Sequence, residues 1–347
     1  MIDKNPAAVI FKQKKNLQIL NLKIQNVPKG YVLVKMKYAG ICHTQLNEIS
    51  GILGKDKFLP HCMGHEGVGE IVSLGKSVKN LKIGDQVVVS WVKKQTNKKF
   101  SSVSYRKGSK IINTGGCNTL LNYSLVSENR IFKISKKNKY HRESVLLGCA
   151  LPTASNAILN NSSITKKSKI LIMGMGGLGY ASLFVLSYLR CSNITCIDSN
   201  INKLNILNNK KKFNFIYINK KKLNEFKKKN INDFDLIIDC TGSKNLIEET
   251  FSLLKPFSGR FIMIGNTKKN EKISINAWDL IAGKTLTGAW GNGGTIMKNF
   301  KTNEKILINQ ISNIKKVLPK KNYKLKEINK ALFDFKNGKI LRPIIKF

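Results

Sequence analysis

The pattern of apolar and polar positions divides the chain into two parts. Up to about residue 150, short alternating or β-branched apolar runs are separated by glycine-rich turns, which is typical of a β-rich domain. The runs that predict strands lie at 31–38, 67–74, 86–91 and 122–126. We therefore expect residues 1–150 to form one β-rich domain.

From residue 151 the pattern alternates between the two periodicities. Buried strands are predicted at 169–173, 194–197, 234–239 and 260–264, with helices at 180–189, 200–208 and 246–254. Such alternation predicts a parallel, doubly wound sheet of the Rossmann type over residues 151–292. After residue 293 a helix at 325–335 and a strand at 343–347 are predicted to complete the first domain. The fold class is thus α/β with two domains.

The net charge of +41 raises the possibility of a polyanionic partner. The excess is spread over both halves, +18 for residues 1–150 and +23 for residues 151–347. The densest lysine runs lie at 210–212, 220–222 and 227–229 and contain few aromatic residues for stacking on bases. We therefore expect a solvated basic surface and do not expect nucleic acid as a partner.

The seven cysteines are scattered at wide spacings. An odd number without a dense framework argues against a disulfide scaffold and favours free or metal-bound thiols. No apolar run approaches the roughly 18 residues that span a bilayer, and the first residues lack the features of a signal peptide. We expect a cytoplasmic protein without a membrane segment.

A glycine-rich turn follows the predicted strand 169–173 and precedes a helix. Its glycines are Gly174, Gly176, Gly177 and Gly179, and Asp198 ends the next strand. In this context the turn allows a close backbone approach to a pyrophosphate at a helix N-terminus, and the aspartate accepts hydrogen bonds from a ribose. A carboxylate there repels the 2′-phosphate of NADP, so NAD is the predicted cofactor. The alternative is that Asp198 only caps the following helix.

Two cysteines and a histidine are candidate metal ligands in the β-rich part. Cys42, His65 and Cys149 together offer two thiolates and an imidazole, a set that suits Zn²⁺ and leaves one position open. Spacings this long do not identify a site, and cysteine is commonly a small buried apolar residue. Chemistry alone leaves both interpretations open.

Five segments and the end of the chain resemble the zinc-containing medium-chain dehydrogenases. The segments are GICHT (40–44), GHEGVGEIVSLG (64–75), LKIGDQV (81–87), LLGCALPTA (146–154), MGMGGLG (173–179) and the closing residues 325–347. The resemblance implies a GroES-like catalytic domain, a Rossmann domain, and a zinc-dependent hydride transfer between an alcohol or polyol, or the matching aldehyde or ketone, and NAD. It also implies a small-molecule substrate and a homodimer or homotetramer.

The resemblance further implies a role for individual residues. Cys42, His65 and Cys149 become the zinc ligands, with Glu66 behind the metal and Thr44 as the start of a proton relay. The implied cofactor contacts are His43 and Arg342 to the pyrophosphate, Thr153 and Leu178 to the nicotinamide, and Lys203 to the adenosine ribose. Trp91 and Trp290 are implied walls of the substrate pocket, against the alternative that both are core packing.

The chain departs from the family pattern at three places. Residues 63–116 contain no cysteine, so the family's second, structural zinc is expected to be absent and one catalytic ion remains. Gln45 replaces a carboxylate that orients the histidine ligand in many relatives, which predicts weaker metal binding. Asn47 stands where some relatives have a histidine for proton release, so the proton is expected to leave through water or ribose hydroxyls.

Two other functions compete with this prediction. A zinc-free quinone or enoyl reductase of the same fold would lack the Cys–His–Cys set, which this chain has. A non-catalytic polyanion-binding protein would bind nucleic acid with an affinity that falls steeply as the salt concentration rises.

Overall fold

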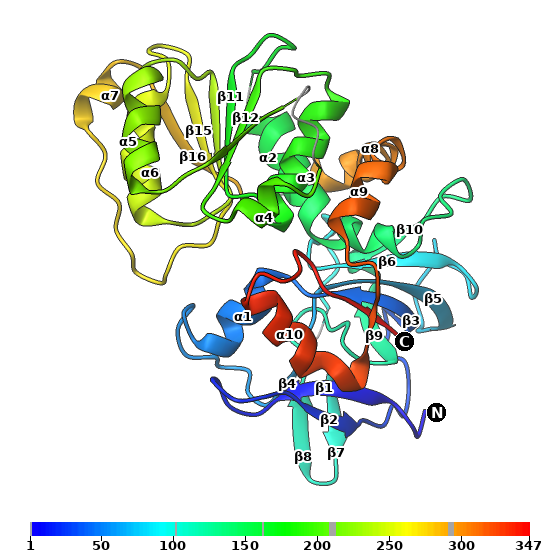
Figure 1. The fold of residues 1–347 in the computed structure, drawn as a ribbon. Helices are drawn as coiled ribbons and strands as arrows, with labels where there is room; N and C mark the ends of the chain where they lie inside the picture. The colour runs from blue at the N-terminus through cyan, green and yellow to red at the C-terminus, as the bar shows by residue number, and fades with distance from the viewer. Residues whose placement is uncertain (1, 101–102, 162, 208–212, 291–294) are drawn as a thin grey trace. The chain divides into compact units, whose positions relative to one another are not determined.

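The computed structural model describes residues 2–100, 103–161, 163–207, 213–290 and 295–347 (Figure 1). The chain separates into two compact units, Met1–Cys149 with Gly293–Phe347, and Ala150–Asn292. None of the helices that the structure describes is long and apolar enough to cross a membrane.

The first unit is built on two β-sheets. The strands of the five-stranded sheet are, in spatial order, β2 (Gln18–Asn21), β1 (Pro6–Ile10), β4 (His61–Cys62), β8 (Lys110–Asn113) and β7 (Ser104–Lys107). The path of the seven-stranded sheet is β10 (Ile131–Lys133), β6 (Gln86–Ser90), β5 (Glu66–Leu74), β3 (Tyr31–Gly40), β18 (Ile344–Lys346) and β17 (Tyr323–Lys324), with β9 (Tyr123–Ser127) also paired to β3.

Helices accompany these strands in the first unit. They are α1 (His43–Ser50), α8 (Thr295–Asn309), α9 (Ile311–Val317), α10 (Ile328–Lys336) and the 3-10 helices η1 (Glu128–Arg130), η2 (Glu143–Gly148) and η4 (Leu325–Glu327). One core cluster joins Ala8 and Ile10 of β1 with Ile328 and Leu332, so helix α10 near the end of the chain packs against the five-stranded sheet.

The end of the chain completes the seven-stranded sheet. Strand β18 pairs antiparallel with β3, with Ile344 opposite Gly40. The Ile41 amide donates to the Pro343 carbonyl at 3.1 Å. This pairing places the residues just before β18 beside the residues that follow β3, although some 300 positions separate them in the chain.

The second unit is a parallel sheet with helices on both faces (Figure 1). The strand order is β13 (Asn214–Tyr217), β12 (Ile194–Asp198), β11 (Ile170–Met173), β14 (Leu236–Asp239), β15 (Arg260–Met263) and β16 (Thr285–Gly288). Its helices are α2 (Ala150–Asn161), α3 (Gly177–Tyr188), α4 (Ile201–Leu204), α5 (Lys220–Lys229), α6 (Lys244–Thr250), α7 (Ala277–Ile281) and η3 (Phe251–Leu253). The predicted α/β class with a doubly wound sheet is confirmed.

Two predicted helices of this unit end earlier than expected. The structure has α4 only to Leu204, and residue 208 of the predicted helix lies outside the described residues. The predicted helix 246–254 starts at Lys244 and becomes a 3-10 turn at Phe251. Phe251 and Leu253 pack into the core cluster of this unit. This tertiary packing explains why the last turn is a 3-10 helix and not a continuation of the α-helix.

Candidate metal and cofactor sites

The structure brings Cys42, His65 and Cys149 together. One ligand atom from each residue lies within 4.8 Å of the other two. Cys42 directly precedes helix α1, His65 precedes strand β5, and Cys149 follows the 3-10 helix η2. Three segments that are distant in the chain therefore meet at a single cluster of one nitrogen and two sulfur atoms.

Glycines permit this convergence at two points. Gly64 has φ of +100°, and a Cβ there would lie 2.5 Å from Oγ1 of Thr119. A Cβ on Gly148 would lie 2.7 Å from the Val89 carbonyl. A larger residue at either place would push His65 or Cys149 away from the cluster.

The donor set fits a zinc ion. Nε2 of His65 is buried and has no hydrogen-bond partner among the described residues. The pKa of Cys42 is held well below its usual range by a hydrogen bond from Cys149 and by the positive charge of Arg342, against the effect of burial. A thiolate, a second thiol and an imidazole nitrogen are what a divalent, borderline-soft ion needs in a three-residue site.

A buried ion pair lies beside the cluster. Nε of Arg342 donates to Oε1 of Glu66 at 2.9 Å, and Nη2 donates to Oε2. The side chains are 3% and 0% exposed, respectively. The two opposite charges compensate each other, and the position of Glu66 behind a metal stays a prediction. The pyrophosphate contact of Arg342 stays a prediction, because its guanidinium is already held by Glu66.

Gln45 contacts the histidine of the cluster. Its Oε1 accepts from the Cys42 backbone N–H at 2.8 Å, and its Nε2 lies 2.7 Å from Nδ1 of His65. With the amide oxygen used by Cys42, the NH₂ group faces Nδ1, which must then accept. The ring proton is left on Nε2, the nitrogen that a metal would need. The amide in place of a carboxylate therefore opposes the metal-binding tautomer.

Glu48 is a neighbour that the sequence analysis did not identify. It lies one turn after Gln45 on α1, and burial raises the pKa of its carboxyl to about 7. The residues His65, Gln45 and Glu48 line one cavity of about 420 Å³. No helix was predicted over these residues, so the sequence offered no signal for this position.

Thr44 and His43 lie in the first turn of α1. The Cys42 thiol lies 3.7 Å from Oγ1 of Thr44, so this hydroxyl is next to the donor set. The His43 ring is exposed and packs edge-on against Phe335, with 5.5 Å between ring centroids.

Trp91 follows β6, and its carbonyl accepts from Arg130. The substrate role of Trp91 stays a prediction.

The glycine-rich turn of the second unit depends on glycine at two positions. Gly174 has φ of +87°, and a Cβ on Gly179 would lie 2.0 Å from the Gly174 carbonyl, so both positions demand glycine. A Cβ on Gly176 would meet nothing within 4 Å. Packing does not require that glycine, and the open space before helix α3 is where a ligand phosphate would approach. Gly177 and Leu178 form the first turn of α3.

Asp198 ends strand β12 and holds this turn. Its Oδ2 accepts from the Met175 N–H at 2.7 Å and its Oδ1 accepts from the Asn200 N–H at 2.8 Å. Nζ of Lys203 lies 3.7 Å away. Asp198 therefore shapes the loop before α4, and a ribose contact would add to this role.

Thr153 is buried on α2, whereas Trp290 is 77% exposed, so core packing does not account for Trp290.

Comparisons with known proteins find similar sequences and folds. Residues 28–136 match the family described as the alcohol dehydrogenase GroES-like domain. The chain is 25% identical to an S-(hydroxymethyl)glutathione dehydrogenase of Haemophilus influenzae, over 82% of each chain. It is also 25% identical to an S-(hydroxymethyl)glutathione dehydrogenase of Escherichia coli, over 82% of this chain and 84% of that relative.

Solved structures show the same fold. Benzyl alcohol dehydrogenase of Acinetobacter calcoaceticus superimposes with a TM-score of 0.84 at 24% identity, over 99% of both chains. The 2R,3R-butanediol dehydrogenase of Bacillus subtilis superimposes with a TM-score of 0.77 at 19% identity, over 99% of this chain and 100% of the other.

Proposed function

We propose that the chain is a zinc-type medium-chain alcohol dehydrogenase, which transfers a hydride between an alcohol or polyol, or the matching aldehyde or ketone, and NAD. The observation that carries the proposal is the meeting of Cys42, His65 and Cys149 within 4.8 Å. The rival zinc-free reductase does not need this set.

Each residue has a defined part in the proposed reaction. Cys42, His65 and Cys149 would hold one zinc ion, which when bound acts as a Lewis acid and lowers the pKa of a substrate hydroxyl. Thr44 would orient the hydroxyl and receive its proton, as its place beside Cys42 allows. Because Asn47 cannot relay a proton as a histidine would, the proton would continue through water or ribose hydroxyls.

The turn around Gly174–Gly179 would bind the pyrophosphate of NAD, which supplies the hydride acceptor. The Asp198 carboxylate would repel the 2′-phosphate of NADP and favour NAD. Residues 63–116 contain no cysteine, which supports one zinc ion per chain and no structural zinc. All seven cysteines are free, which supports a place in the reducing cytoplasm.

A screen of alcohols and polyols tests the proposed reaction. We expect zinc-loaded protein to reduce NAD with at least one primary or secondary alcohol, and NADP far more slowly. Formation of NADH is followed by its absorbance, with chelator-treated protein as the control. Equal rates with and without zinc would favour the zinc-free reductase instead.

We further propose that two copies of the chain associate through the second unit. Strand β16 is at the edge of the parallel sheet, and the helix before it, α7, exposes apolar side chains. The side chains of Trp278 and Ile281 on α7 are 74% and 71% exposed. Phe257, whose backbone N–H donates to the Ala282 carbonyl at the end of α7, is 89% exposed. Large apolar groups beside a sheet edge are costly in water and favour a symmetric pairing.

Changing Ile281 to aspartate is expected to convert a dimer to a monomer, because it puts a charge into the apolar contact. Light scattering after gel filtration should report about twice the chain mass of 39.0 kDa for the unchanged protein and a single chain mass for the variant. Ile231→Asp, at a comparable exposed isoleucine, is the matched control and should remain dimeric. A dimer that survives the Ile281 change would exclude this surface.

A further inference from the structure

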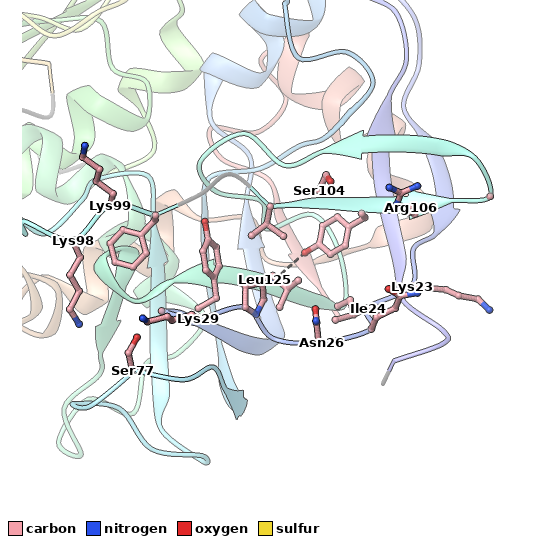
Figure 2. A pocket seen from close by; sticks show the side chains of 18 residues that line it. Lys23, Ile24, Asn26, Lys29, Ser77, Lys98, Lys99, Ser104, Arg106 and Leu125 are labelled. Atoms are coloured by element: carbon pink, nitrogen blue, oxygen red, sulfur yellow. Dashed lines mark hydrogen bonds between the residues drawn. The ribbon is translucent and has the colours of Figure 1, made fainter.

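The first unit has a second, larger pocket to which the dehydrogenase reaction assigns no role. Its volume is about 1110 Å³, and it lies among residues 23–31, 98–100, 103–106 and Leu125 (Figure 2). None of the three candidate metal ligands lines it. The volume lies slightly above the range for small-molecule pockets, roughly 300 to 1000 Å³.

The pocket is rimmed by positive charge. Its lining includes Lys23, Lys29, Lys98, Lys99 and Arg106, all exposed, and none of the described lining residues is acidic. Lys98 pairs with Glu128 at 2.7 Å, and Lys23 lies 3.9 Å from Asp3. In the part of the chain that the structure describes, no carboxylate pairs with the other three cations. Their charge is available to a ligand.

The cations lie toward two ends of the pocket, with uncharged polar and apolar residues between them. Figure 2 shows Lys29, Lys98 and Lys99 toward one end and Lys23 and Arg106 toward the other, with Ile24 and Leu125 between them. A chain of anionic groups could contact both ends while apolar or aromatic parts lie on the middle.

Aromatic residues form part of the lining. Tyr31 and Tyr105 are buried, and Phe100 is half-buried with its ring 6.2 Å from that of Tyr31, in an edge-on arrangement. Gly30 lies beneath the Phe100 ring, where a Cβ would come within 3.0 Å of it. Phe100 is therefore supported on one side and can offer an aromatic surface to a base.

We propose that this pocket binds single-stranded nucleic acid, with backbone phosphates at the two cationic ends and a base against Phe100. Aromatic stacking combined with lysine and arginine contacts is how proteins hold single strands without sequence preference. The net charge of +41 would draw the polyanion from a distance, and the pocket would bind it locally. This function is independent of the dehydrogenase reaction and revises the expectation that the charge is only a solvated surface.

The first test removes charge inside and outside the pocket by the same amount. The triple variant Lys29→Gln, Lys99→Gln, Arg106→Gln is compared with Lys220→Gln, Lys221→Gln, Lys228→Gln on α5, which lowers the net charge equally. Binding of a fluorescent oligothymidylate of about 12 nucleotides, within the range of single-strand sites, is measured by anisotropy on the full zinc-loaded chain. Three lost phosphate contacts should lower the slope of log affinity against log salt by about 2, and affinity by about a hundredfold at 0.1 M salt. The α5 variant should lose less than about threefold.

The second test removes the ring but no charge. Phe100→Leu should lower affinity by about tenfold, as expected for one base–aromatic stack, and leave the salt dependence unchanged. NAD binding and the thermal transition of each variant report whether the fold is kept.

Three results would overturn the proposal. The first is the absence of measurable binding at low salt, and the second is an equal loss in the pocket and α5 variants, which would show that only net charge matters. The third is binding to phosphatidylserine vesicles that the pocket triple variant abolishes while oligonucleotide binding is unchanged, which would assign the pocket to a membrane surface.

Discussion

Replacing Cys42 with serine is expected to remove zinc from the protein and to lower kcat/KM by about a thousandfold or more, while NAD still binds. The metal supplies several kcal/mol of stabilisation to the developing charge, and each 1.4 kcal/mol is a factor of ten in rate. A serine hydroxyl stays protonated near neutral pH, whereas the Cys42 thiol has a pKa lowered by Cys149 and Arg342. The change therefore removes the ligand that is ready to bind a cation.

Zinc content and NAD affinity should be measured on the same preparation. Cys191→Ser is the matched control, because Cys191 is also buried but lies in the second unit and donates to the Thr165 carbonyl. It should keep both zinc and turnover. A Cys42→Ser protein that retained a normal rate would remove the metal from the proposed reaction.

Changing Gln45 to glutamate is expected to tighten zinc binding by about 10 to 100-fold, the usual effect of a partner that orients a histidine ligand. One carboxylate oxygen could keep the Cys42 N–H bond that Gln45 makes at 2.8 Å, and the other could accept from Nδ1–H of His65. With the ring proton on Nδ1, Nε2 would be free to bind the metal. The Gln45 amide can accept from the Cys42 N–H, but its NH₂ group cannot accept from Nδ1–H of His65.

Competition with a chelator of known zinc affinity measures this change. Asn47→Asp is the control, because it adds the same charge on the same helix without a hydrogen bond to Nδ1 of His65. It measures the electrostatic attraction of a new carboxylate for zinc alone, and it should tighten zinc binding much less. Glu48, whose pKa burial raises to about 7, would repel a new carboxylate at position 45. The double variant Gln45→Glu, Glu48→Gln should therefore bind zinc at least as tightly as the single one. Unchanged or weaker binding in Gln45→Glu would show that the amide does not limit the site.

The doubly wound sheet was predictable because it depends on local patterns. The runs at 169–173 and 194–197 form β11 and β12 nearly as expected, since continuous apolar runs bounded by polar turns suit strands buried on both faces. Helix α5 was not identified, because the lysines of 220–229 dominate its composition. Only Leu223 and Phe226, three positions apart, face the core and make it a helix.

The candidate site was predictable only in part. Composition and spacing left Cys42, His65 and Cys149 open between packing and metal binding, and the resemblance to a family decided the expectation. The Glu66–Arg342 pair joins residues 276 positions apart through the pairing of β18 with β3, which no local pattern encodes. The double role of the Gln45 amide likewise depends on where the His65 ring lies, so the sequence could indicate a lost carboxylate but not its consequence.

X-ray absorption at the zinc edge of the purified, zinc-loaded protein tests the central claim most directly. We expect one zinc per chain with two sulfur ligands at about 2.3 Å and nitrogen or oxygen ligands at about 2.0 Å, and loss of one sulfur or of the metal in Cys42→Ser. A first shell without sulfur, or a chain that binds no zinc at all, would contradict the proposed centre.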